Sequence, residues 1–242
     1  MSPNGFDRPN DRSSDKVHIA LSDRHHTLHT QQTYWSYEDI GLFFFAALFL
    51  GVLLHSAVRL HLLSATSLNR PTRALQTVVL LSLLSCLYAI LKLRYRRHVW
   101  RALGWIRPSL RYAVIAVLGG AALAIAVALF VHRSRWVMPP IRFWDLALFG
   151  AILGPALEES FFRGCLLPVL ARTVSVPAAV GLSALLFTAL HKPPTPAQWV
   201  CFTTTGVAYG WMRVRSHSTA AAGLMHSAYN VTLFLCQLAG LC

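Results

Sequence analysis

The chain has 242 residues, of which 55% are hydrophobic and only 13% are Asp, Glu, Lys or Arg. About a quarter of the residues of a soluble domain are normally charged, so this composition indicates a membrane protein. The formal net charge of +13 would suggest nucleic-acid binding in a soluble protein. Here the Lys and Arg residues lie mostly between apolar runs, where they set topology and contact lipid headgroups. No basic stretch interleaved with aromatic residues favours a nucleic-acid groove, and we expect no nucleic-acid partner.

Residues 1–39 form a polar segment of mixed charge that is poor in aliphatic residues and rich in the few acidic residues of the chain. A segment of this composition cannot bury enough apolar surface to fold alone. We therefore predict a mostly disordered cytoplasmic tail. His25, His26 and His29 form a cluster that could bind a metal, although a solvated tail accounts for them more simply.

From residue 40 onwards, the sequence is a series of apolar runs separated by polar loops. A helix needs about 20 apolar residues to cross the hydrocarbon core of a bilayer. The expected fold is an all-α, polytopic membrane helix bundle of about seven transmembrane helices, three of them in residues 40–144 and four in residues 145–240. The predicted spans are residues 40–58, 74–91, 112–131, 145–170, 177–191, 197–213 and 218–240.

Small residues and one proline mark special points of the later spans. Gly150 and Gly154, and again Gly206 and Gly210, have the GxxxG spacing that lets helices approach closely in lipid. Pro155 follows Gly154 directly, and a proline inside a helix removes one backbone hydrogen bond and often causes a kink. Such a kink is equally consistent with ordinary packing and with an opening that admits water.

The loop between the second and third predicted spans is densely basic, because it holds Lys92, Arg94, Arg96, Arg97, Arg101, Arg107 and Arg111. The positive-inside rule places such a loop in the cytoplasm. With seven spans, the amino terminus is then cytoplasmic and the carboxyl terminus lies outside the cell membrane. The opposite side still holds Arg59, Arg70, Arg73, Arg133, Arg135, Arg142 and Lys192, so the bias is only about two to one.

Two adjacent acidic residues lie near the middle of the fourth predicted span, in the stretch LEESFFRG at residues 157–164. A charged side chain at the bilayer centre costs at least about 2.5–3.5 kcal/mol and usually has a function. Glu159 and Arg163 are four residues apart on one helix face, so they can neutralise each other. Glu158 points about 100° away from Glu159, and that pairing leaves it unexplained. We therefore predict a functional role for Glu158.

Three further polar residues accompany the acidic pair. His191 ends the fifth predicted span in FTALH, and His226 and Asn230 share one face of the seventh in HSAYN. A lone histidine in such a span is more often a satisfied core or interface residue, but the combination suits hydrolysis. Glu158 can act as a base and His191 as a second proton carrier, while His226 and Asn230 can donate to a tetrahedral oxyanion. The GxSxG and HExxH motifs are absent.

The stretches EESFFRG, FTALH and HSAYN resemble the three motifs of the CPBP family, which are EExxxR, FxxxH and HxxxN in this order. That family comprises the type II CAAX prenyl endopeptidases and the bacteriocin-processing proteins, also called Abi. The resemblance covers about residues 145–240 and includes the stretch from Gly206 to Ser218 before the third motif. Thr219 and the alanines at 220–222 depart from the aliphatic residue that often follows this serine in the family.

The resemblance implies an intramembrane endopeptidase that acts on a membrane-associated protein or peptide, prenylated or leader-bearing. Glu158 would match the glutamate that activates water together with His191. His226 and Asn230 would match the oxyanion side, with Glu159 and Arg163 in supporting roles. The family is described both as metalloproteases and as metal-free glutamate proteases. A zinc ion would be bound by Glu158, His191 and His226, but Asn230 is a poor zinc ligand, and we expect no cofactor.

Two other functions are compatible with the sequence. The first is a membrane scaffold or bacteriocin self-immunity protein that keeps the fold without turnover. The second is a proton-coupled transporter in which Glu158 is a relay, although transporters often show an internal repeat and none is visible. One feature fits the protease poorly: the predicted topology puts Glu158 at mid-membrane and His191 near the outer boundary, so the fifth span would have to be tilted or shifted.

Overall fold

The computed structural model describes residues 35–60, 73–95, 99–133 and 146–241, and all regular elements in these ranges are helices. An all-α fold is thus confirmed. Most of the predicted tail, with His25, His26 and His29, lies outside the described residues, as do several basic loop residues, among them Arg70, Arg135 and Arg142.

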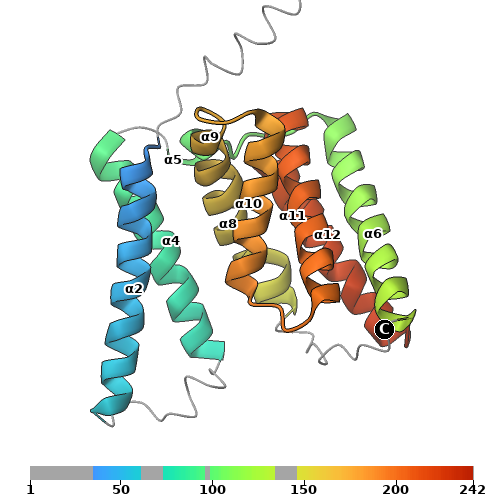
Figure 1. Cartoon of the computed structure of the whole chain (residues 1–242), viewed down its shortest axis with the longest axis horizontal. Helices are drawn as coiled ribbons and strands as arrows, with labels where there is room; N and C mark the ends of the chain where they lie inside the picture. Colours follow the sequence, from blue (N-terminus) through green and yellow to red (C-terminus); the bar gives the residue numbers. More distant parts are fainter. Residues whose placement is uncertain (1–34, 61–72, 96–98, 134–145, 242) are drawn as a thin grey trace, which may run out of the picture. The chain divides into compact units, whose positions relative to one another are not determined.

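Long helical segments occupy all seven predicted positions (Figure 1). The fourth segment is a continuous run of four elements: η1 (Leu146–Leu153), α8 (Gly154–Glu159), η2 (Ser160–Leu166) and α9 (Leu167–Leu170). A short helix, α5 (Val99–Ala102), precedes the third segment. The other segments are α2 (Tyr37–Arg59), α4 (Arg73–Tyr95), α6 (Leu110–Arg133), α10 (Val176–His191), α11 (Pro196–Ser216) and α12 (Thr219–Leu238).

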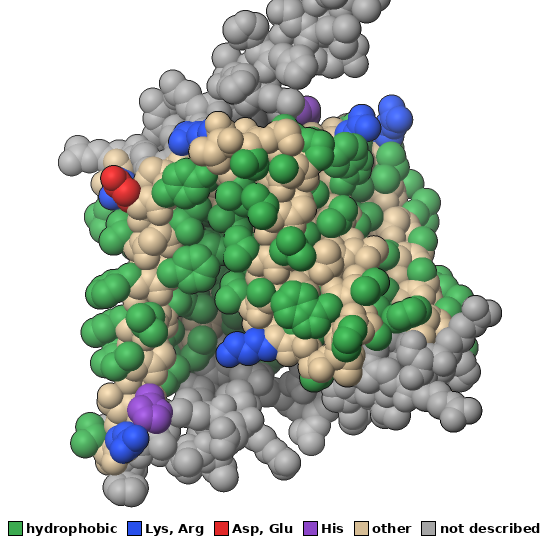
Figure 2. All heavy atoms as spheres, viewed as in Figure 1, with side chains coloured by type: hydrophobic (Ala, Val, Ile, Leu, Met, Phe, Trp, Pro, Cys, Tyr) green, Lys and Arg blue, Asp and Glu red, His purple; other side chains and the backbone are tan. Residues whose placement is uncertain are grey.

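Membrane crossing is less clear than helix formation. By length and composition, two helices of the described residues could span a bilayer: Tyr37–Ala57 and Leu110–Phe130. Val176–His191 is apolar but shorter. Figure 2 shows apolar side chains over the flanks of the helices in view, with the visible Lys and Arg side chains near the helix ends. This distribution fits a membrane environment, but the number of seven spans stays a prediction.

Glycines bring the carboxyl-terminal helices into close contact. α12 packs most extensively against α6, and α10 packs against α11. A Cβ atom on Gly206 would lie 3.0 Å from the Cβ atom of Ala184, and one on Gly210 would lie 3.1 Å from Cγ1 of Val180. The GxxxG spacing in α11 therefore marks a tight contact with α10, as the sequence suggested.

The fourth segment changes from π-helical to α-helical geometry at Gly154 and Pro155, and back to π-helical geometry at Ser160. π-helical turns have hydrogen bonds from residue i to i+5 and are often found at functional sites. Pro155 has no N–H group, so it cannot donate to the carbonyl groups four and five residues before it, those of Ala151 and Gly150.

Side chains of α12 bond to these same two carbonyl groups. Ser227 Oγ donates to the Ala151 oxygen at 2.8 Å, and Asn230 Nδ2 donates to the Gly150 oxygen at 2.7 Å. Proline in a helix is tolerated where neighbouring side chains satisfy the released backbone groups. The π-to-α transition is therefore held in place by α12.

Residues 103–109, which connect α5 to α6, fix the start of α12 at the end of the bundle where α11 finishes. Thr219 donates from its backbone nitrogen to the Gly104 oxygen at 2.8 Å and from Oγ1 to the Leu103 oxygen at 2.6 Å. Trp105 Nε1 donates to Ser160 Oγ at 2.8 Å. The departure from the family pattern at Thr219 is thus explained, because its hydroxyl satisfies a loop carbonyl group that an aliphatic residue could not.

Candidate active site

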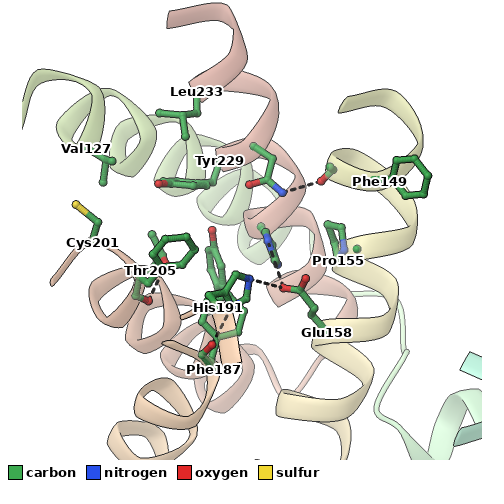
Figure 3. A pocket seen from close by; sticks show the side chains of 16 residues that line it. Val127, Phe149, Pro155, Glu158, Phe187, His191, Cys201, Thr205, Tyr229 and Leu233 are labelled. Atoms are coloured by element: carbon green, nitrogen blue, oxygen red, sulfur yellow. Dashed lines mark hydrogen bonds and ion pairs between the residues drawn. The ribbon is translucent and has the colours of Figure 1, made fainter. Parts of the chain in front are cut away.

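A cavity of about 330 Å³ is enclosed by α6, η1, α8, α10, α11 and α12 (Figure 3). Its lining is mainly apolar and aromatic, which is usual for a small-molecule or peptide pocket. All four residues that the sequence predicted to be catalytic line it: Glu158, His191, His226 and Asn230.

Glu158 faces both histidines. Its Oε2 atom lies 3.8 Å from His191 Nε2 and 4.0 Å from His226 Nε2. The side chain of Glu158 is 28% exposed, but Oε2 is buried and has no hydrogen-bond partner among the described residues. A buried carboxylate oxygen without a donor is rare, and this one lies in the wall of the cavity, between two histidines.

His191 lies beside Glu158, although the predicted topology separated the two in depth. α10 is short and ends at His191, where Lys192 takes a left-handed conformation with φ 48°. The two side chains therefore meet in the structure, and their depth in a membrane stays a prediction.

The hydrogen bond at Nδ1 determines how His191 presents its ring. Nδ1 lies 2.8 Å from the carbonyl oxygen of Phe187. A carbonyl oxygen only accepts, so Nδ1 carries a proton. In the neutral ring, Nε2 then carries the lone pair that faces Glu158 (Figure 3).

Glu159 points away from Glu158, as predicted, and its side chain is fully buried. Its Oε1 atom lies 3.0 Å from Arg163 Nη1, which confirms the predicted i,i+4 pair, and 2.9 Å from His226 Nδ1. The second contact could not be foreseen, because it depends on which face α12 presents to α8. His226 therefore bridges the two acids, with Nδ1 on Glu159 and Nε2 towards Glu158.

Arg163 is buried beneath the cavity. Besides Glu159, its guanidinium binds the carbonyl oxygen of Gly206 through Nη2 at 2.8 Å. Cζ lies 5.0 Å from the ring centroid of Phe187 and 5.3 Å from that of Tyr209, within cation–π range. Arg163 thus joins the fourth segment to α10 and α11.

Tyr209 is a residue of the cavity that sequence reasoning missed. Its ring is stacked on the imidazole of His226, with centroids 4.6 Å apart and planes 18° apart. The available signal was a tyrosine among the small residues of the stretch GVAYG, one residue before Gly210. Nothing in the spacing indicated that this ring faces His226.

A metal centre is not preformed in the cavity. Within the ranges that the structure covers, no three His, Cys, Asp or Glu side chains are grouped so that they could hold a metal ion. The Glu158–histidine distances of 3.8 and 4.0 Å are also wide for atoms that share one tetrahedral zinc ion at about 2.0–2.2 Å. Glu158, His191 and His226 would therefore have to move closer together to bind one zinc ion, and the absence of a cofactor stays a prediction.

The fold and the cavity define a class: a helical protein, apolar on its outer flanks, in which a buried Glu–His–Asn centre lies between helices. Residues 140–232 match a family model described as Rce1-like, type II CAAX prenyl endopeptidase. The part of the chain that carries the three motifs is therefore similar to this family, which confirms the predicted resemblance. The likeness suggests a membrane-embedded protease. No curated protein and no solved structure matches the chain.

Proposed function

We propose that the protein is an intramembrane endopeptidase in which Glu158 and His191 activate a water molecule. The observation that carries this proposal is the Glu158 Oε2 atom, which is buried without a hydrogen bond and faces the Nε2 atoms of both His191 and His226. A water molecule bound between Glu158 and His191 can lose a proton to the carboxylate as it attacks a peptide carbonyl carbon.

His226 acts on the opposite side of the reacting carbonyl group. The buried carboxylate of Glu159 accepts the Nδ1 proton and orients the ring, as the acid of a catalytic triad does. When Nε2 also carries a proton, its N–H group donates to the oxyanion. Collapse of the tetrahedral intermediate breaks the C–N bond, and the proton held by Glu158 passes to the leaving amine.

The substrate is a membrane-associated protein or peptide. The apolar rings of Phe149, Phe187 and Phe202 at the cavity wall suit apolar side chains next to the scissile bond. A prenylated or leader-bearing substrate is compatible with this lining.

A cleavage assay in membranes or detergent, with quenched apolar peptides, tests the proposal. Glu158→Ala and His226→Ala are expected to lower kcat by about 10³-fold or more, because loss of the base or of an oxyanion donor removes transition-state stabilisation. Glu38→Ala and His217→Ala are matched controls, since both side chains lie on the exposed surface away from the cavity, and they should keep wild-type activity. A metal chelator should leave the wild-type rate unchanged.

Full activity in both Glu158→Ala and His226→Ala would refute the proteolytic mechanism. A chain that keeps its cellular effect in both variants would instead be a scaffold or self-immunity protein. Loss of activity with the chelator, restored by zinc, would overturn the metal-free mechanism and leave the protease assignment intact.

A further inference from the structure

The donors that the sequence assigned to the oxyanion are partly engaged elsewhere. Asn230 Nδ2 donates one of its two N–H groups to the Gly150 oxygen at 2.7 Å, where it supports the π-to-α transition. His226 Nδ1 is bound to Glu159 at 2.9 Å, which leaves its Nε2 for the cavity. An oxyanion is usually stabilised by more than one preorganised donor, so a further donor that lines the same cavity can add to these two.

The hydroxyl group of Tyr209 forms no hydrogen bond with the described residues. The residue lines the cavity and is 1% exposed. Its Oη atom is buried and has no hydrogen-bond partner among the described residues. Leaving a buried hydroxyl unpaired costs free energy, and phenylalanine would fill the same space without that cost. The packing of the ring therefore does not explain the hydroxyl.

The position of the ring connects the hydroxyl to the reaction. The Tyr209 ring is stacked on His226, and Cζ of Arg163 lies 5.3 Å from its centroid. The tyrosine ring thus contacts both side chains that Glu159 binds, His226 and Arg163. A side chain with so little freedom is preorganised, which is what makes a donor effective in a transition state.

We propose that Tyr209 is a further catalytic residue, whose hydroxyl donates a hydrogen bond to the oxyanion of the tetrahedral intermediate beside His226 Nε2. This role rests on the proposed endopeptidase function. No proton is transferred: the phenol O–H stays intact, and the hydrogen bond strengthens as negative charge grows on the substrate oxygen. Asn230 then has two tasks, since one N–H group supports the fourth segment and the other is left for the cavity.

The test is Tyr209→Phe, which keeps the ring stacked on His226 and removes only the hydroxyl. Loss of one oxyanion donor is expected to lower kcat by about 10²–10³-fold with KM nearly unchanged, because the contact forms in the transition state. The melting temperature should not fall, since the wild-type hydroxyl has no partner to lose. Tyr112→Phe on α6, outside the cavity, should behave as wild type. A kcat within about threefold of wild type in Tyr209→Phe would overturn the role.

A binding measurement separates this proposal from the endopeptidase assignment. A short apolar peptide aldehyde, whose hydrate resembles the tetrahedral intermediate, should stabilise the wild type against heat more than it stabilises Tyr209→Phe. If the wild type cleaves peptides and both proteins respond equally, Tyr209 has no such role and the protease stands. If the wild type neither cleaves peptides nor responds to the aldehyde, both proposals are wrong.

Discussion

At the scale of single residues, two neighbouring glutamates have opposite environments. Glu158 faces the cavity with an oxygen that binds no donor, whereas Glu159 is fully buried between Arg163 and His226. The cause is helical geometry, because consecutive side chains project about 100° apart and so meet different helices. Glu159 thus pairs with Arg163 and His226, whereas Glu158 is left to face the cavity.

Glu159→Gln should destabilise the protein, whereas Glu158→Gln should not. Removing the carboxylate leaves Arg163 buried without a counter-charge, and breaking such a pair costs about 3–5 kcal/mol. Glu158→Gln removes a charge that no cation neutralises within hydrogen-bond distance, so its melting temperature should stay close to that of the wild type while activity is lost. Thermal unfolding of both variants in one detergent checks this. Equal melting temperatures would contradict the division of roles.

At the scale of helical elements, the sequence predicted the features that depend on local residue patterns, such as the helical segments. The seven segments are helical because long apolar runs must satisfy their backbone polar groups internally, and the Glu159–Arg163 pair follows from spacing within one helix. The His226–Glu159 contact, the stacking of Tyr209 and the closeness of His191 to Glu158 depend on how the helices face and slide past one another. The π-helical turns were also invisible, because bonds from Ser227 and Asn230 on a distant helix stabilise them.

Helix α6 packs on α12, the helix that carries His226, through two adjacent glycines, Gly119 and Gly120. A Cβ atom on Gly120 would overlap the backbone carbonyl oxygen of Met225, whereas one on Gly119 would meet only the Cε atom of the Met225 side chain at 2.8 Å. Gly120→Ala should therefore push the helices apart and lower stability by about 1–3 kcal/mol. Gly119→Ala should cost little, because a flexible methionine tip can move.

Melting temperature and peptide cleavage of the two alanine variants can be compared directly. Gly120→Ala should lower the melting temperature and the rate of peptide cleavage more than Gly119→Ala does, since displacement of α12 also moves His226 and Asn230 relative to Glu158. If Gly119→Ala is the more damaging change, then the contact between α6 and α12 differs from the one described.

At the scale of the whole molecule, the cavity lies towards one end of the carboxyl-terminal helices. Its lining includes His191 at the end of α10, Phe202 early in α11 and Phe149 early in η1. Among the basic residues whose burial the structure describes, most of the exposed ones lie at the other end, including Arg94, Arg101, Arg107, Arg172 and Arg215, whereas Arg59 and Lys192 lie at the cavity end. If the more basic end is cytoplasmic, the cavity is nearer to the outer face and substrates reach it from that side.

Cysteine labelling decides this orientation. Lys192 and His217 are exposed, cap the ends of α10 and α11, and have the same left-handed backbone conformation, so Lys192→Cys and His217→Cys are closely matched variants at opposite ends. A membrane-impermeant maleimide should label Lys192→Cys in intact cells and His217→Cys only after permeabilisation, with the parent chain as the control for native cysteines. The reverse pattern would place the amino terminus outside and open the cavity towards the cytoplasm. Substrates would then be cytoplasmic peptide segments at the inner membrane surface. The cavity lies towards one end of the helices, so it can face the cytoplasm only if every helix has the opposite orientation.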